Sequence, residues 1–148
     1  MTFGVFFVAT GGKHLEELLA NISLSAHFYD GINISLATDC VDIAESSGFF
    51  ENIYPLDSPS FSYRDKILGL QYLPYDYTLF LDSDCKPSFY LKDIFNKLSA
   101  FDIAGCHAPV RIPPGWSDYS IPSFFPEINT GVLFLRNCSL VVTLLSNG

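Results

Sequence analysis

The chain has 148 residues, of which 49% are hydrophobic, 16% aromatic and 16% charged. This length and apolar content fit one compact domain with a substantial core, so we expect a single domain over residues 1–148. Sixteen acidic and eight basic residues give a formal net charge of -8, which argues against nucleic acid as a partner because its phosphates are bound by clusters of Lys and Arg.

Apolar runs of strand length alternate with segments of helical spacing. Phe3–Ala9 follows no basic segment, so it indicates a first strand rather than a signal peptide. Lys13–Phe28 is predicted to be a helix, because Leu15, Leu18 and Ile22 recur at helical spacing. The elements expected after it are, in order, strand Asn33–Thr38, helix Val41–Ser47, strand Asn52–Leu56, helix Phe61–Tyr72, strand Tyr77–Leu81, helix Phe89–Leu98, strand Asp102–His107, strand Thr130–Leu135 and helix Ser139–Leu145.

This alternation predicts an α/β fold with a mostly parallel sheet and helices on both faces. In the helix over Phe61–Tyr72, we expect Ile67, Leu68 and Leu70 to face the core. The stretch from Ala108 to Glu127 is rich in proline and irregular, and a loop of that length usually serves a function. Its Trp116 is either a platform for a sugar ring or an anchor of the loop itself.

The cysteines and the apolar runs indicate where the protein works. Cys40, Cys85, Cys106 and Cys138 form no CxxC pair and no spacing typical of zinc sites. Free, partly buried thiols are therefore favoured over disulfides or metal ligands, as in a reducing compartment. No apolar run approaches the ~20 residues of a membrane-spanning helix. We expect a cytoplasmic protein without a transmembrane segment.

The segment Tyr77–Asp84 carries the most specific chemistry. An apolar strand leads directly into Asp82 and Asp84, and carboxylates at the tip of a buried strand need a compensating positive charge. Mg²⁺ and Mn²⁺ prefer carboxylate, water and phosphate oxygens. In extended backbone, Asp82 and Asp84 would point to the same side, so that one ion could contact both. A solvated turn at the strand end is the alternative.

Two further polar clusters are predicted to lie beside this pair. Thr10-Gly11-Gly12 and Thr38-Asp39 each follow a predicted strand. The carboxyl ends of parallel strands meet at one edge of a sheet, where ligands bind. Asp39 is therefore either a contact for a nucleotide base or ribose, or an ordinary turn aspartate.

Three segments resemble a known family. Tyr77–Asp84 resembles the DxD segment of nucleotide-sugar-dependent glycosyltransferases of the GT-A type, most closely those of family 8. Lys66, on the preceding predicted helix, matches a basic residue that contacts the donor sugar-phosphate in that family. Glu127–Leu135 resembles the family's N-[ST]-G-V strand, whose Asn and Gly line the sugar pocket; here these are Asn129 and Gly131. Val8–Gly12 matches only in position, at the edge that holds the nucleotide base.

The resemblance implies a GT-A fold and a metal-dependent transfer of a sugar from a nucleotide-diphosphate donor, with a UDP-sugar preferred and the acceptor open. It implies Mn²⁺ or Mg²⁺ as the cofactor, held by Asp82 and Asp84. Lys66 would join them in catalysis. The donor contacts implied are Ala9, Thr10, Asp39, Arg64, Lys66, Ser83, Asn129, Thr130 and Gly131. The residues themselves leave Lys66 open as a solvated helix lysine and Asn129 as a cap of the strand start.

Family 8 enzymes are longer than this chain, and their later segments supply a histidine ligand to the metal. The resemblance therefore implies a shortened domain, whose coordination shell is completed by water, by the nucleotide or by a neighbouring subunit. The high aromatic content is compatible with a homo-oligomer.

Three other functions remain open. A non-catalytic domain that binds sugar nucleotides or a protein partner fits the short chain. A nucleotidyltransferase would use a Gly-rich basic loop, of which Thr10–Lys13 is a thin version. A haloacid-dehalogenase-type phosphatase is less favoured, because it needs the motif on its first strand and a Thr or Val where Lys86 stands here.

Overall fold

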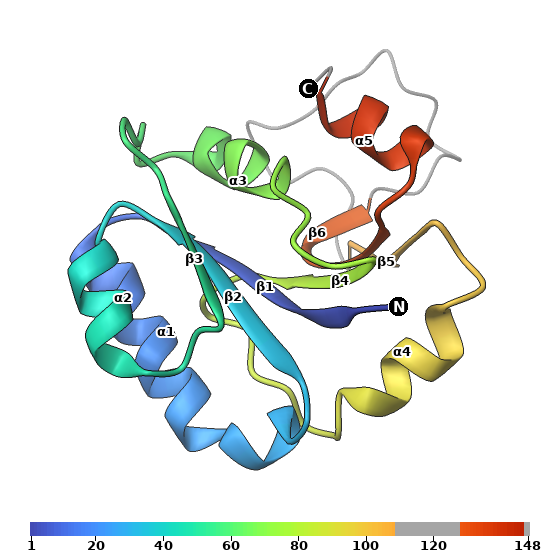
Figure 1. Cartoon of the computed structure of the whole chain (residues 1–148), viewed down its shortest axis with the longest axis horizontal. Helices are drawn as coiled ribbons and strands as arrows, with labels where there is room; N and C mark the ends of the chain where they lie inside the picture. The colour runs from blue at the N-terminus through green and yellow to red at the C-terminus, as the bar shows by residue number, and fades with distance from the viewer. Residues whose placement is uncertain (109–127, 147–148) are drawn as a thin grey trace.

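The computed structural model describes residues 1–108 and 128–146, which form one sheet with helices packed against it (Figure 1). The strands are β1 (Phe3–Ala9), β2 (Asn33–Thr38), β3 (Asn52–Pro55), β4 (Tyr77–Leu81), β5 (Ile103–His107) and β6 (Ile128–Arg136). The helices are α1 (Gly12–Leu24), α2 (Val41–Ser47), α3 (Tyr63–Leu70), α4 (Lys92–Leu98) and α5 (Ser139–Ser146), with a 3₁₀ turn at η1 (Ala26–Tyr29).

The described strands form a six-stranded sheet in the order β3-β2-β1-β4-β6-β5. Strands β3, β2, β1 and β4 are parallel neighbours, whereas β6 runs antiparallel to both β4 and β5. The predicted α/β class with a mostly parallel sheet is confirmed. The single reversed strand is the part of the topology that the sequence pattern does not specify.

Side chains of the central strands alternate between two cores, one on each face of the sheet. Val5 and Phe7 of β1 belong to the core that α1, α2 and α4 cover, and Phe6 belongs to the core that α3 and α5 cover. This alternation is the two-residue period of a strand. All five residues of β4 are buried. The predicted helices on both faces are therefore present, and the strand carrying the aspartates is internal.

Several predicted boundaries are wrong for local reasons. The helix expected over Lys13–Phe28 ends at Leu24, where the Ser25 hydroxyl donates to the Asn21 carbonyl and a 3₁₀ turn follows. The helix expected from Phe89 begins at Lys92, and the strand expected over Thr130–Leu135 extends over Ile128–Arg136. These shifts change lengths and leave the order of elements as predicted.

Helix α3 begins at Tyr63 rather than at Phe61, because Phe61 has a φ of +53° and Ser62 is the N-cap. The Ser62 hydroxyl oxygen accepts from the Arg64 amide at 3.3 Å. The expected inward face of this helix is only partly correct. Leu70 is buried, but Ile67 and Leu68 are exposed.

All four cysteines are free, as expected. Among the residues that the structure describes, no helix is both long and apolar enough to cross a membrane. The stretch with Trp116 lies outside the described residues.

Candidate functional site

The predicted polar clusters meet at one edge of the sheet. Strand β1 lies between β2 and β4, and all three run in the same direction. Thr10, Asp39 and Asp82 each follow one of these strands, so all three lie at the carboxyl edge. Ala9, the last residue of β1, is buried and pairs with Thr38 of β2. This edge is the usual ligand site of open α/β sheets.

The reversed direction of β6 brings Gly131 to the same edge. Leu81 pairs with Val132, and the Asp82 amide donates to the Gly131 carbonyl at 2.8 Å. A Cβ added to Gly131 would stand 2.9 Å from the Asp82 carboxylate, closer than packed atoms tolerate. A side chain at position 131 would therefore displace the Asp82 carboxylate from its present position.

Asp82, Ser83 and Asp84 form a turn instead of continuing the strand. The Cys85 amide donates to the Asp82 carbonyl at 2.9 Å, which closes a turn across Ser83 and Asp84. The expected extended backbone is wrong, so strand alternation does not place the two carboxylates on one side. Asp84 is exposed and Asp82 half-buried. Burial, together with the charges of Asp84 and Asp82, raises the pKa of the Cys85 thiol.

A buried amide from α1 holds this turn from beneath. The Asn21 side chain donates to the Ser83 carbonyl at 2.8 Å, and Asn21 is among the few buried polar residues. The DxD motif does not predict this contact. The sequence feature that could have predicted it is the polar Asn21 on the apolar face of the helix, beside Leu18 and Ile22.

Lys66 of α3 reaches over the sheet to Asp82. Its ammonium nitrogen lies 2.6 Å from Asp82 Oδ1, with 16% of the Lys66 side chain and 34% of the Asp82 side chain exposed. It also donates to the Thr130 carbonyl at 3.4 Å and lies 5.3 Å from the centre of the Phe80 ring. Lys66 is therefore held in the site, not free in solvent.

Asn129, Thr130 and Arg64, which were also predicted to contact the donor, have exposed side chains. The Asn129 side-chain oxygen accepts from the Gly131 amide at 2.8 Å, so the Asn129 side chain caps the start of β6. The described residues offer the Arg64 guanidinium no ion pair.

Asp65 is a buried carboxylate at this edge that the sequence pattern does not reveal. Asp65 is 2% exposed and accepts hydrogen bonds from the Ser60 amide and hydroxyl, the Phe61 amide and the Thr10 hydroxyl. Burial alone would raise its pKa, but these hydrogen bonds outweigh burial and lower the pKa. Asp65 thus joins the end of β1 to the loop before α3.

Asp39 makes a similar connection on the other side of β1. Its Oδ1 accepts from the Gly11 amide at 2.8 Å and lies 3.6 Å from the Cys40 sulfur. Gly11 has a φ of +83°, a conformation that favours glycine. The turn after β1 and the turn after β2 are therefore fixed to each other.

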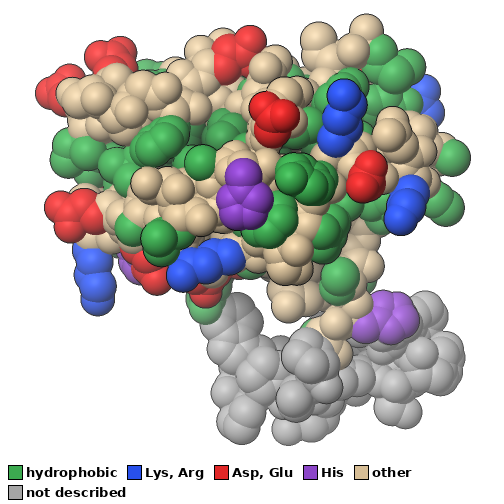
Figure 2. All heavy atoms as spheres, turned by 90° about the horizontal axis from the view of Figure 1, so that it is seen from below, with side chains coloured by type: hydrophobic (Ala, Val, Ile, Leu, Met, Phe, Trp, Pro, Cys, Tyr) green, Lys and Arg blue, Asp and Glu red, His purple; other side chains and the backbone are tan. Residues whose placement is uncertain are grey.

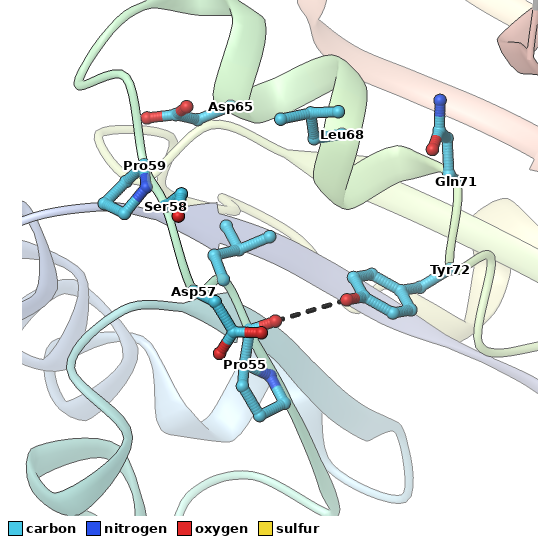
Figure 3. A pocket seen from close by; sticks show the side chains of 9 residues that line it. Pro55, Asp57, Ser58, Pro59, Asp65, Leu68, Gln71 and Tyr72 are labelled. Carbon is cyan, nitrogen blue, oxygen red and sulfur yellow. Dashed lines mark hydrogen bonds between the residues drawn. The ribbon is translucent and has the colours of Figure 1, made fainter.

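Two cavities flank the segment that follows β3. One, of about 470 Å³, lies at the carboxyl ends of β2 and β3, and its walls include Thr38, Asp39, Val41, Leu56, Asp57 and Phe61. The other, of about 390 Å³, lies between this segment and α3 (Figure 3). The Tyr72 hydroxyl donates to the Pro55 carbonyl at 3.2 Å across it.

The donor types at the β4 tip suit a hard divalent cation, because both are carboxylates and one is exposed. Within residues 1–108 and 128–146, no group of three or more His, Cys, Asp or Glu side chains could hold a metal ion.

On the face seen in Figure 2, Lys and Arg side chains are scattered among acidic and apolar ones.

Comparisons with known proteins establish the fold. No protein-family model and no curated protein sequence matches the chain. Among solved structures, the glycosyltransferase GlyE of Streptococcus pneumoniae is 16% identical with a TM-score of 0.61, over 99% of this chain and 38% of its own. TarS of Staphylococcus aureus in complex with UDP-GlcNAc is 17% identical with a TM-score of 0.50, over 77% of this chain and 37% of its own.

A third similar structure is a nucleotidyltransferase-type enzyme. The 4-diphosphocytidyl-2C-methyl-D-erythritol synthase of Anaerococcus prevotii is 16% identical with a TM-score of 0.57, over 99% of this chain and 74% of its own. The chain thus spans less than two fifths of the two transferases just described. These likenesses confirm a GT-A-like sheet, and the narrower resemblance to family 8 stays a prediction.

Proposed function

We propose that this chain is the donor-binding part of a metal-dependent glycosyltransferase that takes a sugar from a nucleotide diphosphate, with a UDP-sugar as the expected donor. The observation that carries the proposal is the meeting of Lys66, Asp82 and Gly131 at the carboxyl edge of β4. The same three segments carry the sequence resemblance to family 8. The similar TarS structure holds UDP-GlcNAc, which supports this class of donor.

Asp82 and Asp84 would hold Mn²⁺ or Mg²⁺, with water and the donor's phosphate oxygens as the other ligands. When bound, such an ion neutralises the negative charge that develops on the leaving diphosphate. Asp84 is the more accessible ligand, because Asp82 already faces the Lys66 ammonium at 2.6 Å. Two carboxylates are donor types that such an ion prefers, which supports this part of the proposal.

The protein's own groups orient the donor. Lys66 is positioned by Asp82 and by the Thr130 carbonyl, so its charge is available beside the place where the diphosphate would lie. A preorganised cation of this kind stabilises developing charge without rearranging. Gly131 lets the backbone of β6 approach the Asp82 carboxylate closely, because a Cβ at this position would stand 2.9 Å from that carboxylate.

A nucleotidyltransferase is the second candidate, since the similar synthase aligns with 99% of this chain and 74% of its own. The two functions differ in the bond that breaks. A glycosyltransferase releases a nucleoside diphosphate from a sugar donor, whereas a nucleotidyltransferase releases pyrophosphate from a nucleoside triphosphate. The released product therefore separates them.

The first test is calorimetric titration with UDP, GDP, ADP and CDP, with and without Mn²⁺. We expect Mn²⁺ to tighten binding of one of them by at least about tenfold, the equivalent of roughly 1.4 kcal/mol. Asp84→Asn should abolish that gain. Asp30→Asn changes an exposed acid in the turn before β2, at the opposite edge, and should preserve it. Equal binding by the Asp84→Asn variant would disprove the metal site.

Turnover on the same samples identifies the reaction. Release of free nucleoside diphosphate from a sugar donor supports the transferase, and release of pyrophosphate from a triphosphate supports the second candidate. Metal-dependent binding with neither release indicates a domain that binds sugar nucleotides without catalysis. Hydrolysis of simple phosphate monoesters would favour a phosphatase.

A further inference from the structure

Phe61 is an unusual residue at the carboxyl edge of the sheet. It is 66% exposed although it is a large aromatic residue, and its φ of +53° lies in a region that bulky side chains rarely adopt. Such a conformation costs free energy and persists only where surrounding contacts enforce it. A disfavoured backbone that presents an aromatic ring to solvent indicates a contact surface.

Asp65 supplies the enforcing contacts. Its two carboxylate oxygens accept from the Ser60 amide at 2.7 Å and from the Phe61 amide at 2.8 Å. The same carboxylate accepts from the Thr10 hydroxyl at 3.0 Å. Because Asp65 is nearly inaccessible to water, these bonds do not compete with solvent. The backbone of Phe61 is therefore fixed relative to the end of β1.

The ring of Phe61 faces a defined neighbour. A Cβ built on Gly11 would stand 3.7 Å from two of its ring carbons, so the ring lies against the Gly11 backbone. The Gly11 amide in turn donates to Asp39. Phe61 and Asp39 also share the wall of the 470 Å³ cavity. An aromatic ring and a carboxylate thus border the same space.

The other walls restrict what this cavity could bind. Val41 and Leu56 are apolar, and Asp39 and Asp57 are acidic. Two carboxylates repel phosphate but accept hydrogen bonds from N–H groups. The two hydrogen bonds that Asp39 accepts from described residues, from the Gly11 amide and the Cys40 thiol, both end at Oδ1. A flat ligand with an apolar face and N–H groups on its edge matches these walls.

We propose that Phe61 is the stacking platform for the base of the nucleotide, with Asp39 and Asp57 as acceptors for the base edge and Asp65 as the residue that positions the ring. The inference rests on the proposed function, because it assigns one end of the donor to the cavity. Strand β1 alone separates β2 from β4, and two strand spacings of about 4.8 Å each match the reach of a nucleoside diphosphate from base to phosphates.

The test separates the base from the phosphates. Calorimetry is run with the nucleoside diphosphate that binds the wild type most tightly, and with its nucleoside alone in the absence of metal. Phe61→Leu keeps an apolar side chain and removes the ring, and it should weaken both ligands by the same factor of about five or more, the usual worth of a stacked base. Phe61→Tyr should bind both ligands as the wild type does.

Phe101→Leu is the matched control, because Phe101 is 54% exposed in the connection before β5, at the opposite edge of the sheet. It should leave both affinities unchanged. If the wild type binds a nucleoside diphosphate and Phe61→Leu binds it equally well, the inference is wrong while the proposed function stands. If the wild type binds none of the four diphosphates, the proposed function fails, and this inference fails with it.

Asp65→Asn examines the positioning role. The Asn side chain has one oxygen that accepts and one NH₂ group that only donates. It therefore cannot accept from the Ser60 amide and the Phe61 amide at the same time. The Phe61 ring should then lose its fixed position. We expect weaker nucleoside binding in a protein that still unfolds cooperatively. Wild-type nucleoside affinity in folded Asp65→Asn would overturn this part. Should that variant fail to fold, Ser60→Ala removes the hydroxyl that donates to the same carboxylate at 2.7 Å, at a residue outside the proposed donor contacts.

Discussion

The ammonium group of Lys66 makes three contacts at the carboxyl edge of the sheet: the Asp82 carboxylate, the Thr130 carbonyl and the face of Phe80. These contacts come from β4 and β6, so one side chain from α3 joins two strands. Because Asp82 is a third exposed, the pair retains contact with water. An ion pair of this kind contributes little to stability and much to orientation.

Replacing Lys66 with Met should therefore affect binding more than folding. We expect the metal-dependent affinity for the nucleoside diphosphate to fall by about tenfold or more, since one charged contact is lost. The free energy of unfolding should change by less than about 1 kcal/mol. Calorimetry and urea denaturation measure the two quantities. Lys97→Met, at an exposed position in the last turn of α4, is the control and should change neither.

A larger loss of stability than of affinity in Lys66→Met would contradict this assignment. It would indicate that the ion pair holds β4 to β6 and has no part in binding.

Some residues of the site can be predicted from the sequence, and others cannot. Lys66 and Asp82 stand in a recognisable motif, and the structure brings them within 2.6 Å. Asp65, directly before Lys66, looks like an ordinary solvated helix acid until the fold buries it. Phe61 looked like a helix residue, because its positive φ depends on the hydrogen bond to Asp65. Roles that depend on long-range hydrogen bonds have no local pattern.

Strand β6 shows how direction decides which residues meet. Residues 129–131 stand at its amino end, and they reach the carboxyl end of β4 only because the two strands are antiparallel. In a wholly parallel sheet, the same residues would lie at the opposite edge. Alternating hydrophobicity predicts a strand but not its direction, so the sequence alone could place Gly131 beside Asp82 only through the family resemblance.

Helix α1 contributes to the site through its buried face. Asn21 supports the turn of Asp82–Cys85 by donating to the Ser83 carbonyl, and the same face carries Leu18 and Ile22 into the core. The helix therefore couples the packing of one face of the sheet to the position of Asp84. A substitution on the buried face of α1 should therefore alter the turn although it contacts neither Asp82 nor Asp84.

Asn21→Ala should destabilise the protein by about 1–3 kcal/mol, because the partly buried Ser83 carbonyl loses its donor. It should also weaken the Mn²⁺-dependent gain in nucleotide affinity, because the turn is no longer held. Urea denaturation and calorimetry at a temperature where the variant is folded measure both effects. Ser23→Ala lies on the exposed face of the same helix and is the control. An unchanged metal-dependent gain in folded Asn21→Ala would show that the amide serves stability alone.

The molecule has two hydrophobic cores, one on each face of the sheet, so the central strands are buried on both sides. The apolar runs of β1 and β4 predict this arrangement, because only a sheet covered on both sides buries every residue of such a run. The paired cores bear it out, with Val5 on one side and Phe6 on the other. Boundaries were less predictable, since they depend on caps and turns such as Ser62 and Ser25.

Two tyrosines buried in this framework link its stability to alkaline pH. Burial, with a smaller contribution from Cys85, raises the pKa of Tyr29 to about 12. Burial also raises the pKa of Tyr75 to about 12, with Glu51 adding to the effect and the hydrogen bond with Ser35 opposing it. In the unfolded chain both hydroxyls ionise near pH 10. Between these values the unfolded state binds fewer protons than the folded state, so stability falls as pH rises.

We therefore expect the free energy of unfolding to be insensitive to these two groups below about pH 10 and to fall between about pH 10 and 12, by on the order of 2 kcal/mol for each tyrosine. Urea denaturation at stepped pH, followed by circular dichroism, measures the slope. Tyr29→Phe and Tyr75→Phe should each make the slope shallower, because a phenyl ring has no proton to lose. If the double variant lost stability as steeply as the wild type, other groups would be responsible for the alkaline transition. A shallower slope for Tyr75→Phe alone would locate the transition at the hydrogen bonds that join Tyr75 to Ser35 and Glu51, near the start of β1, and so away from the carboxyl edge where the nucleotide is proposed to bind.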